Sequence, residues 1–384
     1  MIRAFDYDLI VIGSGPSGRR AAVQASKFGR AVLIVDRRGQ VGGVSVHTGT
    51  IPSKTLRETV LNLTGWRERG IYGLNYRVKQ HIEAQDLHMR LGKTLGDEVE
   101  VLEHQFLRNG VEVACGDARF VDSHTLDISD NAGAIRRVTG KAIVIAVGSE
   151  PHRPREIPFD DRYVIDSDGM VKLDHIPRSL TVVGAGVIGI EYASIFSALD
   201  VRVTVIDKGD HIMTFMDHEL ISEFVHQLRE QGITFRLGSA LDSIVIEADQ
   251  PVAVLEGGRR VRADLLLYTG GRQGATADLN LAAAGLEADT RGRLKVDPIT
   301  FQTSVQNIYA TGDVIGFPSL ASTSMEQGRI AACHACGEPV PPAPKFFPYG
   351  IYSVPEMSMV GMTEEEAKKS GIPYETGIAR FRET

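Results

Sequence analysis

Cysteine is scarce in this chain, which has only three in 384 residues: Cys115, Cys333 and Cys336. Three thiols cannot form the disulfide framework that holds many small secreted domains together. Cys333 and Cys336 form a Cys-x-x-Cys pair, for which a redox-active disulfide is one interpretation. Because the pair falls on an expected helix, we favour small buried helix residues, and we interpret Cys115 as an apolar residue at a strand end.

The chain also lacks an excess of positive charge. Its 42 Lys and Arg against 49 Asp and Glu give a net charge of −7, which argues against a nucleic-acid or anionic-membrane partner. The N-terminal residues have none of the features of a signal peptide. The longest apolar run, residues 180–199, has one charge, Glu191. A membrane span is one interpretation of this run, but its three glycines and Glu191 favour a buried strand–turn–helix. We expect a cytoplasmic protein without a membrane partner.

Glycine is abundant, with 40 residues, and it marks two copies of one pattern. Residues 8–36 and residues 180–207 each contain an apolar strand, three spaced glycines, a helical stretch and a second strand that ends on an acid. In such a fingerprint the first glycine makes a tight turn, the second lets the backbone approach a pyrophosphate, and the third lets the helix pack on the strand. The acid accepts hydrogen bonds from a ribose. The residues are Gly13, Gly15, Gly18 and Asp36 in the first copy, and Gly184, Gly186, Gly189 and Asp207 in the second. The sequence therefore predicts two dinucleotide sites.

The remaining elements follow from apolar periodicity and from turn residues. Residues 37–51 are expected to be a loop, and the Pro-rich residues 150–158 a domain boundary. We predict helices over residues 53–65, 78–109 (ending at Gly110), 219–231 and from about Leu320, and strands over residues 111–114, 125–128, 142–147, 244–255 and 265–268. Thr363 and Glu366 predict a capping box for a further helix, which ends at Gly371.

A family resemblance covers essentially the whole chain. It rests on residues 42–54 (GGVSVHTGTIPSK) and on the phrases GVIGIEYASIF and GDVIGFPSLA. The chain resembles the two-dinucleotide flavoprotein disulfide reductases, and it looks most like their soluble pyridine nucleotide transhydrogenase branch. In the disulfide reductases the 42–54 segment carries two cysteines that form the redox-active disulfide. Here Ser45 and Thr50 hold those positions, and a hydroxyl cannot undergo the redox cycle of a thiol.

The resemblance implies an α/β fold with two Rossmann-like dinucleotide-binding domains. Residues 1–152 and 273–344 would form a discontinuous FAD-binding domain, and residues 153–272 the NAD(P)-binding domain. Residues 345–384 would be the incomplete start of an α+β interface domain. The family is expected to form homodimers or higher oligomers. An incomplete interface domain leaves apolar surface exposed, so we expect reduced stability or a partner chain that supplies the rest.

The resemblance also implies roles for individual residues, with no metal site. Lys54 would lie near the flavin and pair with Glu191, the two forming the catalytic pair. The alternatives are an ordinary helix-start lysine and a core-edge acid satisfied by a neighbour. The residues expected to bind the cofactors are Gly13, Gly15, Pro16, Ser17, Gly18, Asp36, Arg37, Gly42, Gly43, Val44, Ser45, Lys54, Gly148, Gly184, Gly186, Val187, Ile188, Gly189, Glu191, Asp207, Lys208, Gly271, Gly312, Asp313, Leu320 and Ala321.

Three of these positions carry finer expectations from the resemblance. Asp313 would bind the ribityl–phosphate region of FAD. Val187 would lie where other members of the family place a tyrosine over the flavin. Asp207 suits the two ribose hydroxyls of NAD, while Lys208 and His211 could offset its repulsion of the 2′-phosphate of NADP. His47, the one histidine near the chemistry, is a weak candidate for a general acid.

The leading hypothesis is FAD-dependent hydride transfer between NADPH and NAD+, with ping-pong kinetics through reduced flavin and no redox-active disulfide. NAD(H) and NADP(H) would be the substrates and FAD the resident cofactor. One alternative is an NAD(P)H diaphorase or quinone reductase that uses the same flavin. The other is a non-catalytic flavin-binding remnant.

Overall fold

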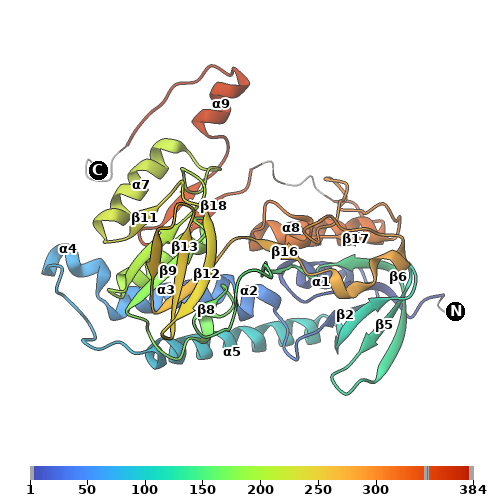
Figure 1. Cartoon of the computed structure of the whole chain (residues 1–384). Coiled ribbons are helices and arrows are strands. Elements are labelled where there is room, and N and C mark those ends of the chain that lie inside the picture. Colours follow the sequence, from blue (N-terminus) through green and yellow to red (C-terminus); the bar gives the residue numbers. More distant parts are fainter. Residues whose placement is uncertain (1–3, 341–343, 345, 380–384) are drawn as a thin grey trace.

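Two sheets, each with parallel strands around one glycine fingerprint, organise the protein (Figure 1). The computed structural model describes residues 4–340, 344 and 346–379. In the first sheet, β3-β2-β1-β6 run side by side in parallel; β17 pairs with the end of β6, and β5 and β4 continue from its beginning as an antiparallel meander. These strands are β1 (Tyr7–Ile12), β2 (Val32–Asp36), β3 (Glu112–Cys115), β4 (Asp117–Phe120), β5 (Thr125–Ser129), β6 (Ile135–Ile145) and β17 (Ile308–Ala310).

Helices cover one face of this sheet. Strand β2 is buried along its whole length, as expected for a parallel strand with both faces covered. Helices α1 (Pro16–Lys27) and α8 (Ala321–Cys336) pack against each other on that face. They approach so closely that a Cβ on Gly328 would lie 2.0 Å from the carbonyl oxygen of Ser17. The end of helix α5 (Ala84–Arg108) completes this layer through Leu102 and Phe106.

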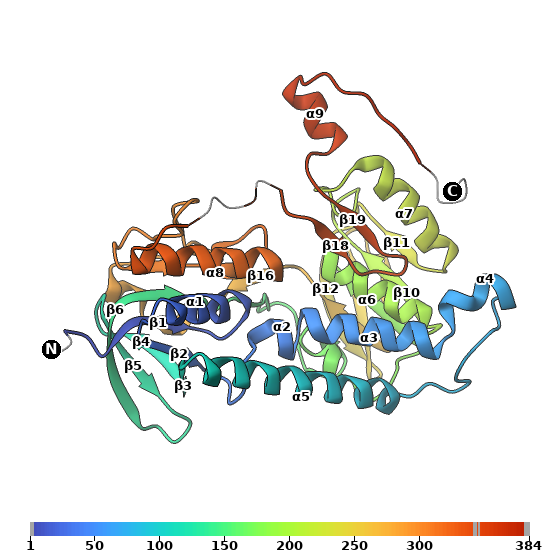
Figure 2. The same cartoon turned by 180° about the vertical axis from the view of Figure 1, so that it is seen from behind.

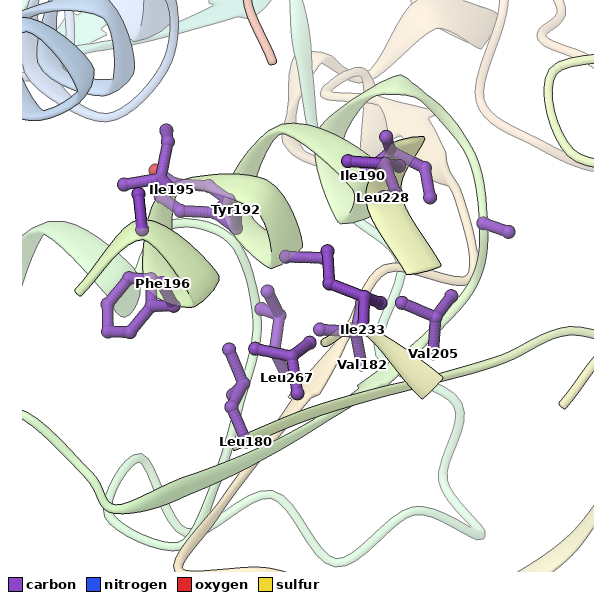
Figure 3. Packing of buried hydrophobic residues seen from close by; sticks show 14 of the residues in the cluster. Leu180, Val182, Ile190, Tyr192, Ile195, Phe196, Val205, Leu228, Ile233 and Leu267 are labelled. Atoms are coloured by element: carbon purple, nitrogen blue, oxygen red, sulfur yellow. The ribbon is translucent and has the colours of Figure 1, made fainter. Parts of the chain in front are cut away.

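The second sheet has the strand order β11-β10-β9-β15-β8 and is parallel throughout. Its apolar side chains pack against helices α6 (Val187–Ala198) and α7 (His218–Glu230). Figure 3 shows Leu180, Val182 and Leu267 of this sheet next to the side chains of α6. An antiparallel sheet of β12, β13 and β14 covers the opposite face. The strands are β8 (Val164–Ile165), β9 (Ser179–Val183), β10 (Arg202–Ile206), β11 (Thr234–Arg236), β12 (Leu241–Glu247), β13 (Gln250–Leu255), β14 (Arg260–Arg262) and β15 (Leu265–Tyr268).

The two halves are joined at several places. The segment that leads from the first half to the second and the segment that returns pair as the antiparallel strands β7 (Ser149–Pro151) and β16 (Arg272–Gly274). Helices α2 (Gly43–His47) and α3 (Thr50–Leu63) run from the first sheet toward the second, and α5 runs back along them (Figure 2). Helix α3 contacts α6. The Lys54 and Glu191 side chains therefore come from helices that already pack together.

The C-terminal residues lie against the second half of the molecule. Strands β18 (Tyr349–Ile351) and β19 (Met357–Met359) form a hairpin. Ile351 belongs to the apolar core between the second sheet and helices α6 and α7, which we call the second core. Helix α9 (Glu364–Ser370) follows and extends away from α7 (Figure 1). The short helices are α4 (Arg69–Tyr72), η1 (Trp66–Glu68), η2 (Met170–Lys172), η3 (Ala277–Leu279), η4 (Leu281–Ala284) and η5 (Gly312–Ile315).

The predicted α/β class is confirmed, and so is most of the element order. Residues 180–199 form strand β9, a turn and helix α6, and no helix in the described part of the chain is long and apolar enough to cross a membrane. The capping box of Thr363 and Glu366 is present, and Gly371 ends α9 with a φ of 70°. Residue 345, at the predicted start of the interface domain, lies outside the described residues.

Three local predictions are wrong, and strand β4 was missed. Part of the expected 37–51 loop is helix α2, because the left-handed Gly42 turns the chain and Val46 is buried. Val46 belongs to the apolar core between the first sheet and helices α1, α5 and α8, which we call the first core. Helix α5 starts at Ala84 and not at residue 78, because Glu83 and Asp86 form a capping box there. Strand β4 was not predicted, because an alternation of polar and apolar residues over only four positions cannot be distinguished from a loop in the sequence. Cys115 does end a strand, β3, but it is exposed and does not pack as an apolar residue.

Candidate dinucleotide and redox site

The first fingerprint has the geometry that a dinucleotide needs. Gly13 has a φ of +103°, and a Cβ there would lie 2.3 Å from the carbonyl oxygen of Ala146. A Cβ on Gly18 would lie 1.9 Å from the carbonyl oxygen of Gly13, so this position sets the helix-to-strand packing. A Cβ on Gly15 would meet no atom within 4 Å. The second glycine therefore faces open space at the N-terminus of α1, where backbone N–H groups favour an anion.

That open space is part of a cavity of about 190 Å³. The predicted site residues that line it are Gly13, Gly15, Pro16, Ser17, Asp36, Arg37, Gly43, Val44, Ser45, Gly148, Gly312, Asp313 and Ala321. These residues lie in α1, β2, α2, η5 and α8 and in the turns that follow β1, β2 and β6, so the fold brings distant parts of the sequence together. Gly18, Gly42, Lys54 and Leu320 do not line the cavity. Gly18 packs inside the turn, the Gly42 N–H donates to the Ser14 hydroxyl, and Leu320 is the N-cap of α8.

Asp36 is buried and ties this site together. Its carboxylate accepts hydrogen bonds from the Ser14 N–H at 2.8 Å, from the Ser14 hydroxyl and from the Arg38 N–H at 2.9 Å. The Ser14 Oγ in turn accepts the Gly42 N–H at 2.8 Å. Ser14 was missed by the sequence reasoning, although it stands between the first two glycines. Arg38 was missed as well: it lines the cavity, and its buried Nη1 has no hydrogen-bond partner among the described residues.

The cavity also reaches strand β7, one of the two strands that join the halves, through Ser149. Asp313 accepts the hydroxyl proton of Ser149 at 2.8 Å. The Arg272 guanidinium donates to the Ser149 Oγ at 2.9 Å and to the Ser149 carbonyl at 2.7 Å. Gly271, a predicted site residue, lies outside the cavity and accepts the His152 N–H at 3.0 Å. Its place is in the crossing between the two halves.

The second fingerprint repeats the geometry of the first. Gly184 has a φ of +108°, with a hypothetical Cβ 2.7 Å from the Thr269 carbonyl oxygen, and a Cβ on Gly189 would lie 2.1 Å from the carbonyl oxygen of Gly184. Gly186 again has open space around it. Val187 and Ile188, the first residues of α6, are half-buried against the second core. Two segments with little sequence in common thus use their three glycines in the same three ways.

Asp207 occupies the place that Asp36 has in the first copy. It accepts the Ala185 N–H at 2.6 Å through one oxygen and the Gly209 N–H at 2.8 Å through the other. Lys208 is exposed beside it. The ring of His211 lies 4.4 Å from the ring of His218, centroid to centroid.

Lys54 and Glu191 form an ion pair. The Lys54 Nζ lies 2.9 and 2.7 Å from the two carboxylate oxygens of Glu191. The Glu191 side chain is 6% exposed and that of Lys54 is 28% exposed. Because a buried carboxylate without a partner is costly, this pair explains how an acid is tolerated in the apolar helix α6.

No thiol lies at the cavity. Ser45 is in α2 and Thr50 begins α3, and both line the cavity. All three cysteines of the chain are free. Cys333 and Cys336 are on α8, and burial raises the pKa of both thiols. The Nε2 of His47, the residue considered above as a general acid, lies 2.9 Å from the Val41 carbonyl oxygen.

The family model for pyridine nucleotide-disulphide oxidoreductases matches residues 7–328, and the model for the dimerisation domain of the same family matches residues 347–384. The chain belongs to this family. Its members carry out pyridine nucleotide-linked flavoprotein redox chemistry, and the protein is accordingly an oxidoreductase. Both glycine fingerprints lie within the matched residues 7–328.

Known relatives are similar over nearly the whole chain. A soluble pyridine nucleotide transhydrogenase of Mycobacterium tuberculosis is 50% identical over 379 residues, which is 98% of this chain and 81% of that protein. One of Colwellia psychrerythraea is 43% identical over 384 residues, covering 100% of this chain and 82% of the relative.

Solved structures of the family have the same fold. The flavoprotein disulfide reductase RclA of Escherichia coli matches with a TM-score of 0.83 at 28% identity, over 95% of this chain and 80% of that one. LpdA of Mycobacterium tuberculosis matches with a TM-score of 0.87 at 26% identity, over the same shares.

Proposed function

We propose that the protein is an FAD-dependent transhydrogenase that exchanges hydride between NADPH and NAD+. The observation that carries this proposal is the pair Ser45 and Thr50, which line the cavity where the family name implies a disulfide. FAD would supply the two-electron chemistry by accepting hydride from one nucleotide and giving it to the other. Relatives named as soluble pyridine nucleotide transhydrogenases, at 43 and 50% identity, support this proposal.

In this proposal the first fingerprint holds FAD. The open space at Gly15 takes the pyrophosphate at the start of α1, and Asp36 accepts hydrogen bonds from the ribose. The Arg38 Nη1, which has no partner among the described residues, would donate to FAD. Asp313, which accepts a hydrogen bond from Ser149, would bind the ribityl chain. Lys54 supplies a positive charge beside the flavin, held in place by Glu191. These residues bind and orient the cofactor, and none of them undergoes oxidation.

The second fingerprint would hold the nicotinamide nucleotides. Gly186 leaves room for their pyrophosphate, and Asp207 faces the adenosine ribose. Asp207 suits the two hydroxyls of NAD, and Lys208 offsets its charge when the 2′-phosphate of NADP enters. A single site for both nucleotides requires one to leave before the other enters. We therefore propose ping-pong kinetics.

The larger assembly is proposed on the same basis. We assign residues 1–152 and 273–344 to the FAD-binding domain, residues 153–272 to the NAD(P)-binding domain and residues 345–384 to the interface domain. The match to a dimerisation domain supports a homodimer. Exposed apolar side chains of the last residues, Val360, Met362, Ile372 and Ile378, are available for such an interface. We place the reaction in the cytoplasm.

The test is a steady-state assay without oxygen, in which NADPH reduces thio-NAD+, an analogue whose reduced form absorbs at its own wavelength. We expect turnover, with parallel lines in double-reciprocal plots at varied concentrations of both nucleotides. Electron transfer only to quinones or dyes would favour a diaphorase and refute the proposal. Bound FAD that neither nucleotide reduces would favour a non-catalytic remnant.

A further inference from the structure

The segment between β18 and β19 contacts the Lys54–Glu191 pair directly. The Tyr352 N–H donates to Glu191 Oε1 at 2.8 Å, and the same oxygen accepts from Lys54 Nζ at 2.9 Å. The neighbouring Ile351 is 1% exposed and belongs to the second core. The C-terminal hairpin thus adds a third hydrogen bond to a carboxylate that has two from Lys54.

The ring of Tyr352 also covers Lys54. The Lys54 Nζ lies 4.9 Å from the centroid of this ring, within the range of a cation–π contact. The ammonium group is therefore held between a carboxylate and an aromatic face. A lysine side chain has several rotatable bonds, and contacts on two sides restrict its rotamers.

The hairpin is anchored to the same two helices that carry the pair. On α6, the Ser194 Oγ accepts the Val354 N–H at 3.0 Å and donates to the Glu191 carbonyl at 2.9 Å. On α3, the buried Arg57 donates its Nε–H to the Ser353 carbonyl at 2.9 Å and pairs with Glu356.

The spacing of these anchors matches that of the pair. Arg57 follows Lys54 by three residues, and Ser194 follows Glu191 by three residues, so each anchor lies one helical turn from its member of the pair and on the same face. Each helix therefore contributes two side chains to the contact with the hairpin: one member of the ion pair and one anchor.

We propose that Tyr352 is a positioning residue for Lys54. Its N–H and its ring together hold the Lys54–Glu191 pair in the orientation used when the bound flavin is reduced. This inference rests on the proposed function only for the identity of the group that Lys54 faces. It concerns the reductive half-reaction, whichever acceptor takes the electrons afterwards.

The test compares Tyr352→Leu, which removes the ring, with Tyr352→Phe, which keeps it. Tyr349→Leu is the matched control, because Tyr349 lies in the same hairpin and its ring contacts Phe215 and Phe317 instead of Lys54. The first readout is the rate of acylation of Lys54 by a small amine-reactive reagent, measured by peptide mass spectrometry of the purified flavoprotein. Lys93, whose side chain is 79% exposed, serves as the internal reference.

We expect Tyr352→Leu to raise the acylation of Lys54 relative to Lys93 by about 3- to 10-fold, the size of a partly exposed cation–π contact. The second readout is the rate of flavin reduction by NADPH in a stopped-flow instrument, which should fall by a similar factor, about 3- to 10-fold, at an unchanged Kd for NADPH. Tyr352→Phe and Tyr349→Leu should behave as the wild-type protein in both measurements.

Three results would overturn the inference. The first is an unchanged acylation rate in Tyr352→Leu, and the second is an equal effect of Tyr349→Leu, which would point to general loosening of the hairpin. The third is a Tyr352→Phe variant that matches Tyr352→Leu, since the ring would then not be responsible. A wild-type protein that transfers no hydride to NAD+ would refute the proposed function alone, because neither readout uses NAD+.

Discussion

Breaking the Lys54–Glu191 pair from one side should destabilise the protein far more than removing both partners. In Lys54→Met, the Glu191 carboxylate, 6% exposed, keeps only one of its three hydrogen bonds, the one from the Tyr352 N–H. Loss of one partner from a fully buried pair costs about 3–5 kcal/mol. Because the Lys54 side chain is 28% exposed, water can reach the site, and we expect a value near the lower limit, ~3 kcal/mol.

The double variant Lys54→Met/Glu191→Leu removes both charges and fills the site with apolar groups of similar size. It should lie within about 1 kcal/mol of the wild-type protein, because replacing a whole buried pair is often neutral. A coupling energy of at least ~2 kcal/mol should therefore appear in the double-mutant cycle.

Urea unfolding of the flavin-free protein measures this directly. The single tryptophan, Trp66, lies just beyond the end of α3 and packs against the second core, so its fluorescence reports on the region of the pair. Single-variant effects that simply add, with a coupling energy under about 0.5 kcal/mol, would refute the reasoning. Equal unfolding curves for all four proteins would do so as well.

Three further predictions concern other parts of the structure. Gly15→Ala should fold normally, since its Cβ meets open space, but should bind FAD at least ~10-fold more weakly by equilibrium titration; Gly13→Ala, at a φ of +103°, should lower the thermal midpoint instead. Asp207→Ser should shift the ratio of kcat/KM toward NADPH over NADH by about 10-fold, because a carboxylate repels the 2′-phosphate; an unchanged ratio would show that this residue does not discriminate. Maleimide at neutral pH should label exposed Cys115 well before Cys333, whose pKa is raised by burial. Labelling in the reverse order would contradict the exposure of Cys115 and the burial of Cys333.

The sequence predicted well whatever depends on local chemistry. The two fingerprints were recognisable because their glycines serve three separate steric needs, and the structure gives Gly13 and Gly184 the same left-handed backbone. The partner of Glu191 was predictable from a simple argument: a buried carboxylate in an apolar helix needs a cation. The resemblance to the family then pointed to Lys54.

What the sequence could not show depends on contacts between distant segments. Helix α2 looked like a glycine-rich loop because the burial that stabilises Val46 comes from the first core, including α5. Ser14 and Arg38 carry no motif of their own, and their roles depend on where Asp36 lies. Tyr352 is far from Lys54 and Glu191 in the sequence, and only the docking of the C-terminal hairpin brings them together.

The central claim is that a bound flavin is the sole electron store of this protein, because Ser45 and Thr50 replace the thiol pair. An anaerobic titration of the purified flavoprotein with NADPH, followed by absorbance and by a thiol reagent after denaturation, tests it most directly. We predict that a single two-electron equivalent per flavin completes the bleaching and that no new thiols appear. Uptake of a second equivalent, accompanied by new titratable thiols, would contradict the account.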